Sequence, residues 1–126
     1  MANLISFDGF VQEGNGPIYQ QILLYLKRGI AAGRIGDGDE LPSRRVLSAR
    51  LGVNPNTVQK AYRLLEEEGL IQSHAGAKSY MALDEAKIAA VRGQLLEEEI
   101  RQAVAALKQL GLDKAEALAL MEQYWQ

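Results

Sequence analysis

Residues 41–71 read LPSRRVLSARLGVNPNTVQKAYRLLEEEGLI, and this stretch decides the fold. Ser43 is a residue type that caps helix N-termini, and Gly52 can end the short helix after it in a tight turn. Asn54-Pro55 then supplies a capping residue followed by a proline that suits a first helical turn. The inner faces of these two helices are predicted to consist of Val46, Leu47 and Leu51 in the first and Val58, Ala61, Tyr62 and Leu65 in the second.

The flanking sequence predicts one helix before this stretch and a β-hairpin after it. Pro17 opens an earlier helix, in which apolar residues recur four apart at Ile18, Ile22, Leu26 and Ile30. Residues 70–74 and 79–83 contain short apolar runs on either side of a glycine turn, which predicts a β-hairpin. Helix, helix, tight turn, helix and hairpin is the order of a winged helix-turn-helix, which we predict for residues 17–83. Residues 1–16 end in a cluster of helix-breaking residues and are predicted to be an N-terminal arm.

From residue 84 the sequence predicts two further helices, separated by Gly111. Their apolar residues follow steps of three and four, which is a heptad-like seam. Two such helices must fold onto the winged domain or pair with a second copy, and we favour the second copy. The predicted fold class is therefore mainly α with a small β-hairpin wing (α+β), a winged helix-turn-helix followed by a two-helix dimerisation region over residues 84–126. The predicted dimerisation residues are Leu96, Ile100, Ala103, Leu107, Leu110, Leu118, Met121 and Trp125.

The composition argues against several classes of protein. The 126 residues include no cysteine and a single histidine, His74, so we expect no metal, no cofactor and no thiol or Ser-His-Asp catalysis. The sequence offers no nucleophile–base pair and no glycine-rich phosphate loop after a strand, so an enzyme is not expected. No apolar run approaches the roughly 18 residues of a membrane span, and the first ten residues lack a signal-peptide pattern. We therefore expect a cytoplasmic protein without a membrane partner.

The net charge of −2 hides a local asymmetry. Residues 41–63 contain no Asp or Glu, whereas residues 84–126 carry five basic and eight acidic side chains. Because distant charges are screened over about 8–10 Å, a local basic face can attract an anionic partner even on an acidic chain. The basic residues of this stretch are Arg44, Arg45, Arg50, Lys60 and Arg63.

Four motifs stand in order at residues 17–22 (PIYQQI), 41–47 (LPSRRVL), 51–58 (LGVNPNTV) and 61–71 (AYRLLEEEGLI). Together they resemble the DNA-binding domain of GntR-type bacterial transcription regulators. The short two-helix tail is similar to that of the YtrA-like branch, whose members lack large effector-binding domains and in which the tail is implicated in dimerisation. The resemblance implies a sequence-specific regulator, a repressor, that binds an inverted-repeat operator in double-stranded DNA as a homodimer.

The candidate DNA-binding residues follow from the geometry of a helix-turn-helix, whose second helix reads base edges while the first crosses the phosphate backbone. Asn and Gln can pair with adenine, Lys can reach guanine, and the Thr methyl group can meet thymine. The start of the preceding helix favours phosphate, and the resemblance implies a DNA contact for Arg45. Arg63 can reach a phosphate or pair with Glu66 or Glu67, and we favour pairing. The resemblance also implies contacts from the wing, so the predicted DNA-binding residues are Ser43, Arg44, Arg45, Asn54, Asn56, Thr57, Gln59, Lys60, Gly76 and Lys78.

Two points stay open. The family wing reads Arg-Gly-x-Gly-Thr-Phe-Val, whereas residues 75–81 read AGAKSYM, with Ala75 and Lys78 in place of the arginine and the second glycine. Either Lys78 supplies the charge from a neighbouring position or the wing contributes less. The alternative function is a protein-interaction module, whose basic face docks an acidic partner. A small-molecule effector that changes the angle between two winged domains is a further hypothesis, and no sequence pattern marks its pocket.

Overall fold

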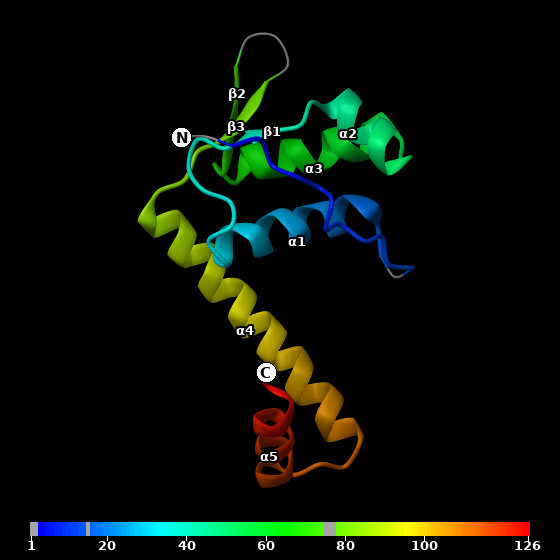
Figure 1. Cartoon of the computed structure of the whole chain (residues 1–126), viewed down its shortest axis with the longest axis vertical. Helices are drawn as coiled ribbons and strands as arrows, with labels where there is room; N and C mark the ends of the chain where they lie inside the picture. Colours follow the sequence, from blue (N-terminus) through cyan, green and yellow to red (C-terminus); the bar gives the residue numbers. More distant parts are fainter. Residues whose placement is uncertain (1–2, 15, 75–77) are drawn as a thin grey trace. The chain divides into compact units, whose positions relative to one another are not determined.

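The computed structural model describes residues 3–14, 16–74 and 78–126, and it divides the chain into two compact units, residues 1–92 and residues 93–126 (Figure 1). The first unit holds three helices, a three-stranded sheet and the start of α4. The second unit holds the rest of α4 and α5. The helices are α1 (Ile18–Ala31), α2 (Arg44–Leu51), α3 (Pro55–Glu67), α4 (Glu85–Gln109) and α5 (Lys114–Tyr124). The predicted fold class, mainly helical with a small β wing, is confirmed.

The residues predicted to start and end helices between residues 43 and 55 do so in the structure. Ser43 caps α2, because its Oγ accepts a hydrogen bond from the backbone N–H of Val46 at 3.1 Å. Gly52 ends α2 in the left-handed region, with φ of 68°, which a residue without a Cβ adopts without strain. Pro55 occupies the first turn of α3, where its missing N–H costs no hydrogen bond.

The core of the first unit lies between α3 and its neighbours α1 and α2, and α1 and α3 run side by side in Figure 1. One face of α3 is completely buried, and α1 and α2 contribute apolar side chains that are equally inaccessible. Full burial of a Leu or Ile side chain contributes about 1.5–3 kcal/mol, so this packing fixes the relative positions of the three helices. The buried residues are Ile22, Leu26 and Ile30 of α1, Leu47 of α2, and Val58, Ala61, Tyr62 and Leu65 of α3.

The sheet has one strand more than the sequence predicts. The expected hairpin is present as β2 (Ile71–Ser73) and β3 (Ser79–Met81), paired antiparallel with Ile71 opposite Met81. The additional strand β1 (Glu40–Leu41) pairs antiparallel with β3, giving the order β1-β3-β2. Leu41 therefore belongs to a strand that the sequence pattern does not predict. A strand of two residues has no alternation that a sequence pattern could show.

The prediction for Val46 is also wrong, since its side chain is 58% exposed. Packing on α3 turns Leu47 of α2 into the core, where it is fully buried. Val46, one residue earlier and about 100° away, points to solvent.

Residues 3–13 pack on the first unit. Leu4 forms a parallel bridge to Glu40, and the N–H of Ile5 donates to the Glu40 carbonyl at 2.8 Å. Ile5 and Phe7 are buried. The ring centroids of Phe7 and Tyr25, on α1, lie 4.9 Å apart. The N-terminal segment thus contributes apolar side chains to the same core as α1.

The first residues of α4 are tied to the first unit. Lys87 Nζ donates to the carbonyl oxygens of Gly69 and Ala82 at 2.6 and 3.0 Å, and an Arg92 guanidinium N–H donates to the Ala31 carbonyl at 3.1 Å. In the second unit, Asp113 caps α5 by accepting from the Glu116 N–H at 2.9 Å, as its sequence position predicts.

The packing of the N-terminal segment predicts that Phe7→Ala lowers the free energy of unfolding by about 3 kcal/mol, because it removes a buried aromatic side chain and leaves a cavity. Urea denaturation followed by circular dichroism measures this change. Val11→Ala is the matched control, since Val11 is exposed, and it should change the free energy by less than about 0.5 kcal/mol. Equal effects of the two substitutions would show that residues 3–13 are not part of the core.

Candidate nucleic-acid interface

The N-terminus of α2 concentrates positive potential. In its first turn, which lies wholly within the described residues, there is no acidic side chain, and the first two helical residues are Arg44 and Arg45. The unpaired N–H groups of a first turn and the helix dipole both favour an anion there. Ser43 Oγ accepts from the Val46 N–H and keeps its own O–H donor, so an anion there would meet that hydroxyl and the remaining backbone N–H groups.

Arg44 is held against an aromatic ring. Its guanidinium carbon lies 5.2 Å from the centroid of the Tyr62 ring, within cation–π range. Tyr62 is itself fixed, because its Oη donates to the Pro42 carbonyl at 2.7 Å. Burial raises the pKa of the Tyr62 hydroxyl, and the Arg44 charge offsets only part of that rise. Arg44 Nε is buried, and nothing among the described residues accepts a hydrogen bond from it.

The other basic residues of this region fall into two groups. Arg50 forms an ion pair with Asp8, and Arg63 pairs with Glu67 at 3.7 Å, so the favoured pairing of Arg63 is confirmed. Arg45 is exposed and forms no ion pair with any residue that the structure describes. Lys60 Nζ lies 4.1 Å from the centroid of the Tyr19 ring. The positive charges of Arg45 and Lys60 are therefore not neutralised by a described carboxylate.

The start of α3 presents polar side chains to solvent. Asn54 caps the helix, its Oδ1 accepting from the Asn56 N–H at 2.8 Å, which leaves its amide NH₂ group for another partner. Asn56 and Gln59 are exposed, and Thr57 is half-buried. Asn56, Gln59 and Lys60 lie on the side of α3 opposite its buried face, since the helical period separates them from Val58 and Ala61.

The wing is described only in part. Lys78 is exposed just before β3, and its carbonyl accepts from the His74 N–H at 2.9 Å. Gly76, together with Ala75, lies outside the described residues, so the prediction for Gly76 has no structural counterpart here. The structure therefore places nine of the ten predicted DNA-binding residues on α2, on α3, at the N-caps of these two helices or just before β3, all within the first unit.

In the second unit an apolar groove lies between α4 and α5. Three of the eight predicted dimerisation residues lie outside the lining of this groove. Leu96 is exposed on α4, Leu110 follows the end of α4, and Trp125 follows α5 and is 83% exposed. Trp125 therefore does not anchor the tail within a single chain. The groove lining includes five of the eight predicted dimerisation residues, Ile100, Ala103, Leu107, Leu118 and Met121.

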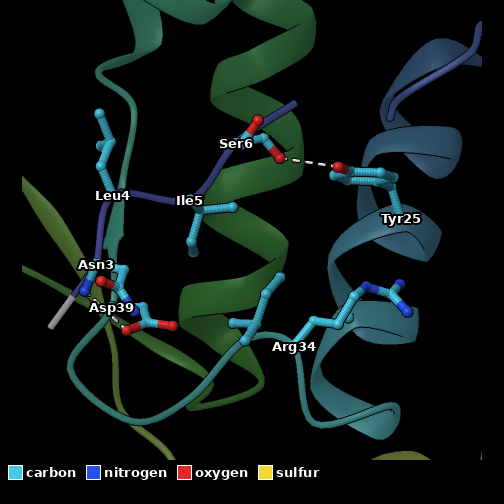
Figure 2. Close-up of a pocket in the computed structure, with 9 residues that line it drawn as sticks. Asn3, Leu4, Ile5, Ser6, Tyr25, Arg34 and Asp39 are labelled. Carbon is cyan, nitrogen blue, oxygen red and sulfur yellow. Dashed lines mark hydrogen bonds between the residues drawn. The ribbon is translucent and has the colours of Figure 1, made fainter. Parts of the chain in front are cut away.

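A cleft also lies between residues 3–6 and α1 (Figure 2). The Asp39 carboxylate accepts from the backbone N–H groups of Asn3 at 3.1 Å and Gly36 at 2.8 Å. Tyr25 Oη donates to the Ser6 carbonyl at 2.8 Å, the contact drawn between the two labelled residues. The Asp39 carboxylate and the Tyr25 hydroxyl are thus already bonded within the chain, and the cleft lends no support to the effector hypothesis.

Sequence reasoning missed the side chains that hold the basic residues in place. The sequence pattern places Tyr62 on the inner face of its helix and does not single out Tyr19, although a cation lies over the ring of each. Asp8 lies 42 residues from Arg50, a separation at which no helical or strand period links two positions.

The fold and this surface define a winged helix-turn-helix protein of the DNA-binding class. The model of the gntR family of bacterial regulatory proteins matches residues 18–80, and the chain belongs to that family. It is 39% identical over 90 residues to the transcriptional repressor YtrA of Bacillus subtilis, covering 70% of this chain and 68% of the relative. The gntR family and YtrA are transcription regulators, not enzymes.

Two solved structures extend the comparison. A GntR family transcriptional regulator from Listeria monocytogenes is similar with a TM-score of 0.78 and 30% identity, over 89% of this chain and 98% of that chain. The DNA-binding domain of AraR, solved in complex with operator ORX1, is similar with a TM-score of 0.50 and 27% identity, over 64% of this chain and 96% of that chain. No helix in the described part of the chain is both long enough and apolar enough to cross a membrane.

The cap at the start of α3 predicts that Asn54→Ala lowers the free energy of unfolding by about 1 kcal/mol, because the Asn56 N–H loses its acceptor. Asn54→Ser is the control that keeps a capping oxygen, and it should stay within about 0.5 kcal/mol of the unsubstituted protein. Thermal unfolding of the two variants makes the comparison. A loss of equal size in both would mean that the cap does not stabilise α3.

Proposed function

We propose that this protein is a sequence-specific transcriptional repressor that binds an inverted-repeat operator as a homodimer. The observation that carries the proposal is the exposed surface formed by the first turns of α2 and α3, where Arg45, Asn56 and Gln59 stand free of described carboxylates. Two similar proteins also support the proposal: YtrA is named a transcriptional repressor, and the AraR domain was solved in complex with an operator.

The division of labour follows the order of elements. We assign DNA binding to residues 17–83, with residues 1–16 as an arm, and dimerisation to residues 84–126. The starts of α2 and α3 supply phosphate contacts and base contacts respectively, as in other helix-turn-helix proteins. The eight acidic side chains of residues 84–126 would be repelled by DNA, which suits a region that holds two copies together rather than one that binds phosphate.

Dimerisation would place two reading helices about a two-fold axis. An isologous pair then requires an operator with inverted symmetry, with half-sites about one helical turn of DNA apart. The apolar groove between α4 and α5 supports this proposal, since a second copy would remove its exposed side chains from water. A small-molecule effector would act on the angle between the two winged domains and remains an additional hypothesis.

DNA binding is tested by fluorescence anisotropy with a duplex from upstream of the protein's own gene and a scrambled duplex, over a series of salt concentrations. The native duplex should bind more tightly by about a thousandfold, with a log–log salt slope near −0.9 for each phosphate contact. Arg45→Ala should weaken binding by at least about tenfold and make the slope shallower, because it removes a cation at the α2 N-terminus.

Arg101→Ala is the matched control for charge. Arg101 lies on α4 in the second unit and pairs with Glu97 at 2.6 Å, so its loss should leave operator affinity unchanged. If neither duplex binds above the nonspecific level, and selection from genomic fragments also returns no site, the basic face serves a protein partner. That result would favour the interaction module over the repressor.

The dimer proposal predicts that Ile100→Glu converts a dimer to a monomer, because it places a carboxylate in the apolar groove. Ile100 is exposed in the single chain, so the protomer should keep its fold. Sedimentation equilibrium measures the mass. Ala105→Glu, at an exposed position of α4 outside the groove lining, is the control and should stay dimeric. A monomeric unsubstituted protein at the concentration that saturates the operator would contradict the proposal.

A further inference from the structure

The contact between Lys60 and Tyr19 joins the proposed reading helix to a helix outside the helix-turn-helix. Lys60 Nζ lies 4.1 Å from the centroid of the Tyr19 ring, close enough for the ring quadrupole to attract the ammonium group. Tyr19 belongs to the first turn of α1, and α1 packs alongside α3. Tyr19 is half-buried and Lys60 is exposed, so the pair lies at the surface rather than in the core.

The kind of partner that Lys60 has sets it apart from nearby arginines. Asp8 and Glu67 neutralise Arg50 and Arg63, which would have to give up those ion pairs to meet a phosphate. An aromatic ring restrains a cation without cancelling its charge. The ring also engages only one side of an ammonium group that carries three N–H donors, so donors remain for another acceptor.

We propose that Tyr19 is a positioning residue that holds the Lys60 ammonium ready for a DNA phosphate. The proposal rests on the proposed function. A free lysine side chain loses rotamer freedom when it binds, and that loss weakens association. Because Tyr19 restrains Lys60 before DNA arrives, less freedom is lost on binding. The ring lies on α1, so the restraint on the Lys60 ammonium comes from an element outside the helix-turn-helix.

Arg44 follows the same arrangement independently. Its guanidinium lies over Tyr62, whose hydroxyl is anchored to the Pro42 carbonyl, and no described carboxylate pairs with it. Two cations on the proposed DNA-binding surface are thus oriented by tyrosine rings and keep their full charge. This repetition fits a surface that must present ordered positive charge to a polyanion.

The test uses the full chain and the operator duplex found by the anisotropy experiment. Tyr19→Leu should raise the dissociation constant by about three- to tenfold, the cost of ordering a free lysine on binding. Tyr19→Phe keeps the ring and should restore affinity to within about twofold, although it removes the hydroxyl that accepts from Gln20 Nε2 at 3.2 Å. A Phe variant as weak as the Leu variant would overturn the proposal.

The charge itself is tested by Lys60→Met, which keeps an apolar stem. It should weaken binding and reduce the magnitude of the log–log salt slope by about 0.9, the value for one phosphate contact. Arg101→Met removes the same charge from the second unit and should leave the slope unchanged. In the Lys60→Met background Tyr19→Leu should have no further effect, because the cation that the ring restrains is gone. Additive effects, or an unchanged slope in Lys60→Met, would overturn the proposal.

A spectroscopic readout on the free protein is independent of DNA. Protons of the Lys60 ε-methylene group should resonate upfield of their usual position because of the Tyr19 ring current, and the shift should disappear in Tyr19→Leu. An unshifted resonance in the unsubstituted protein would overturn the proposal even if Tyr19→Leu proved too unstable to study. If the unsubstituted protein binds no specific duplex, the proposed function fails as well; if it binds and only the Lys60 tests fail, the positioning role alone is wrong.

Discussion

Four side chains on one face of α3, those of Val58, Ala61, Tyr62 and Leu65, are completely excluded from water, and the rest of the first unit is arranged around them. Because a helix repeats every 3.6 residues, burying this face turns Asn56 and Gln59 to solvent. Tyr62 adds a hydrogen bond that ties α3 to the residue just before the α2 cap. Burial of one side of α3 therefore fixes both the polar face of that helix and the position of the α2 N-terminus beside it.

Most of the fold follows from local rules that the sequence displays. Ser43, Asn54 and Asp113 are caps in the structure, and each is of a residue type that favours caps and stands just before a helical pattern. Strand β1 and the outward direction of Val46 could not be predicted in this way. A two-residue strand is defined by its partner β3, some 40 residues later, and the rotation of an eight-residue helix is set by which neighbour buries it.

The candidate site also depends on contacts that local sequence patterns do not predict. Residue types and spacing indicate which side chains could meet DNA, but they do not show which cations are already engaged. Arg50 and Lys60 both lie in the stretch without Asp or Glu, and the structure pairs the first with Asp8 from the N-terminal segment and places the second over Tyr19. Contacts of this kind join elements far apart in the chain, so no local pattern reports them. They decide how much positive charge the surface of α2 and α3 presents.

We propose that the starts of α2 and α3 form the surface that meets DNA. The most direct test of this proposal is a titration of ¹⁵N-labelled protein with the duplex from upstream of its own gene, followed through the backbone amide resonances. The largest changes should fall on residues 43–46 and 54–60, with residues 93–126 little affected. Changes confined to residues 93–126, or to residues outside α2 and α3, would show that another surface meets DNA.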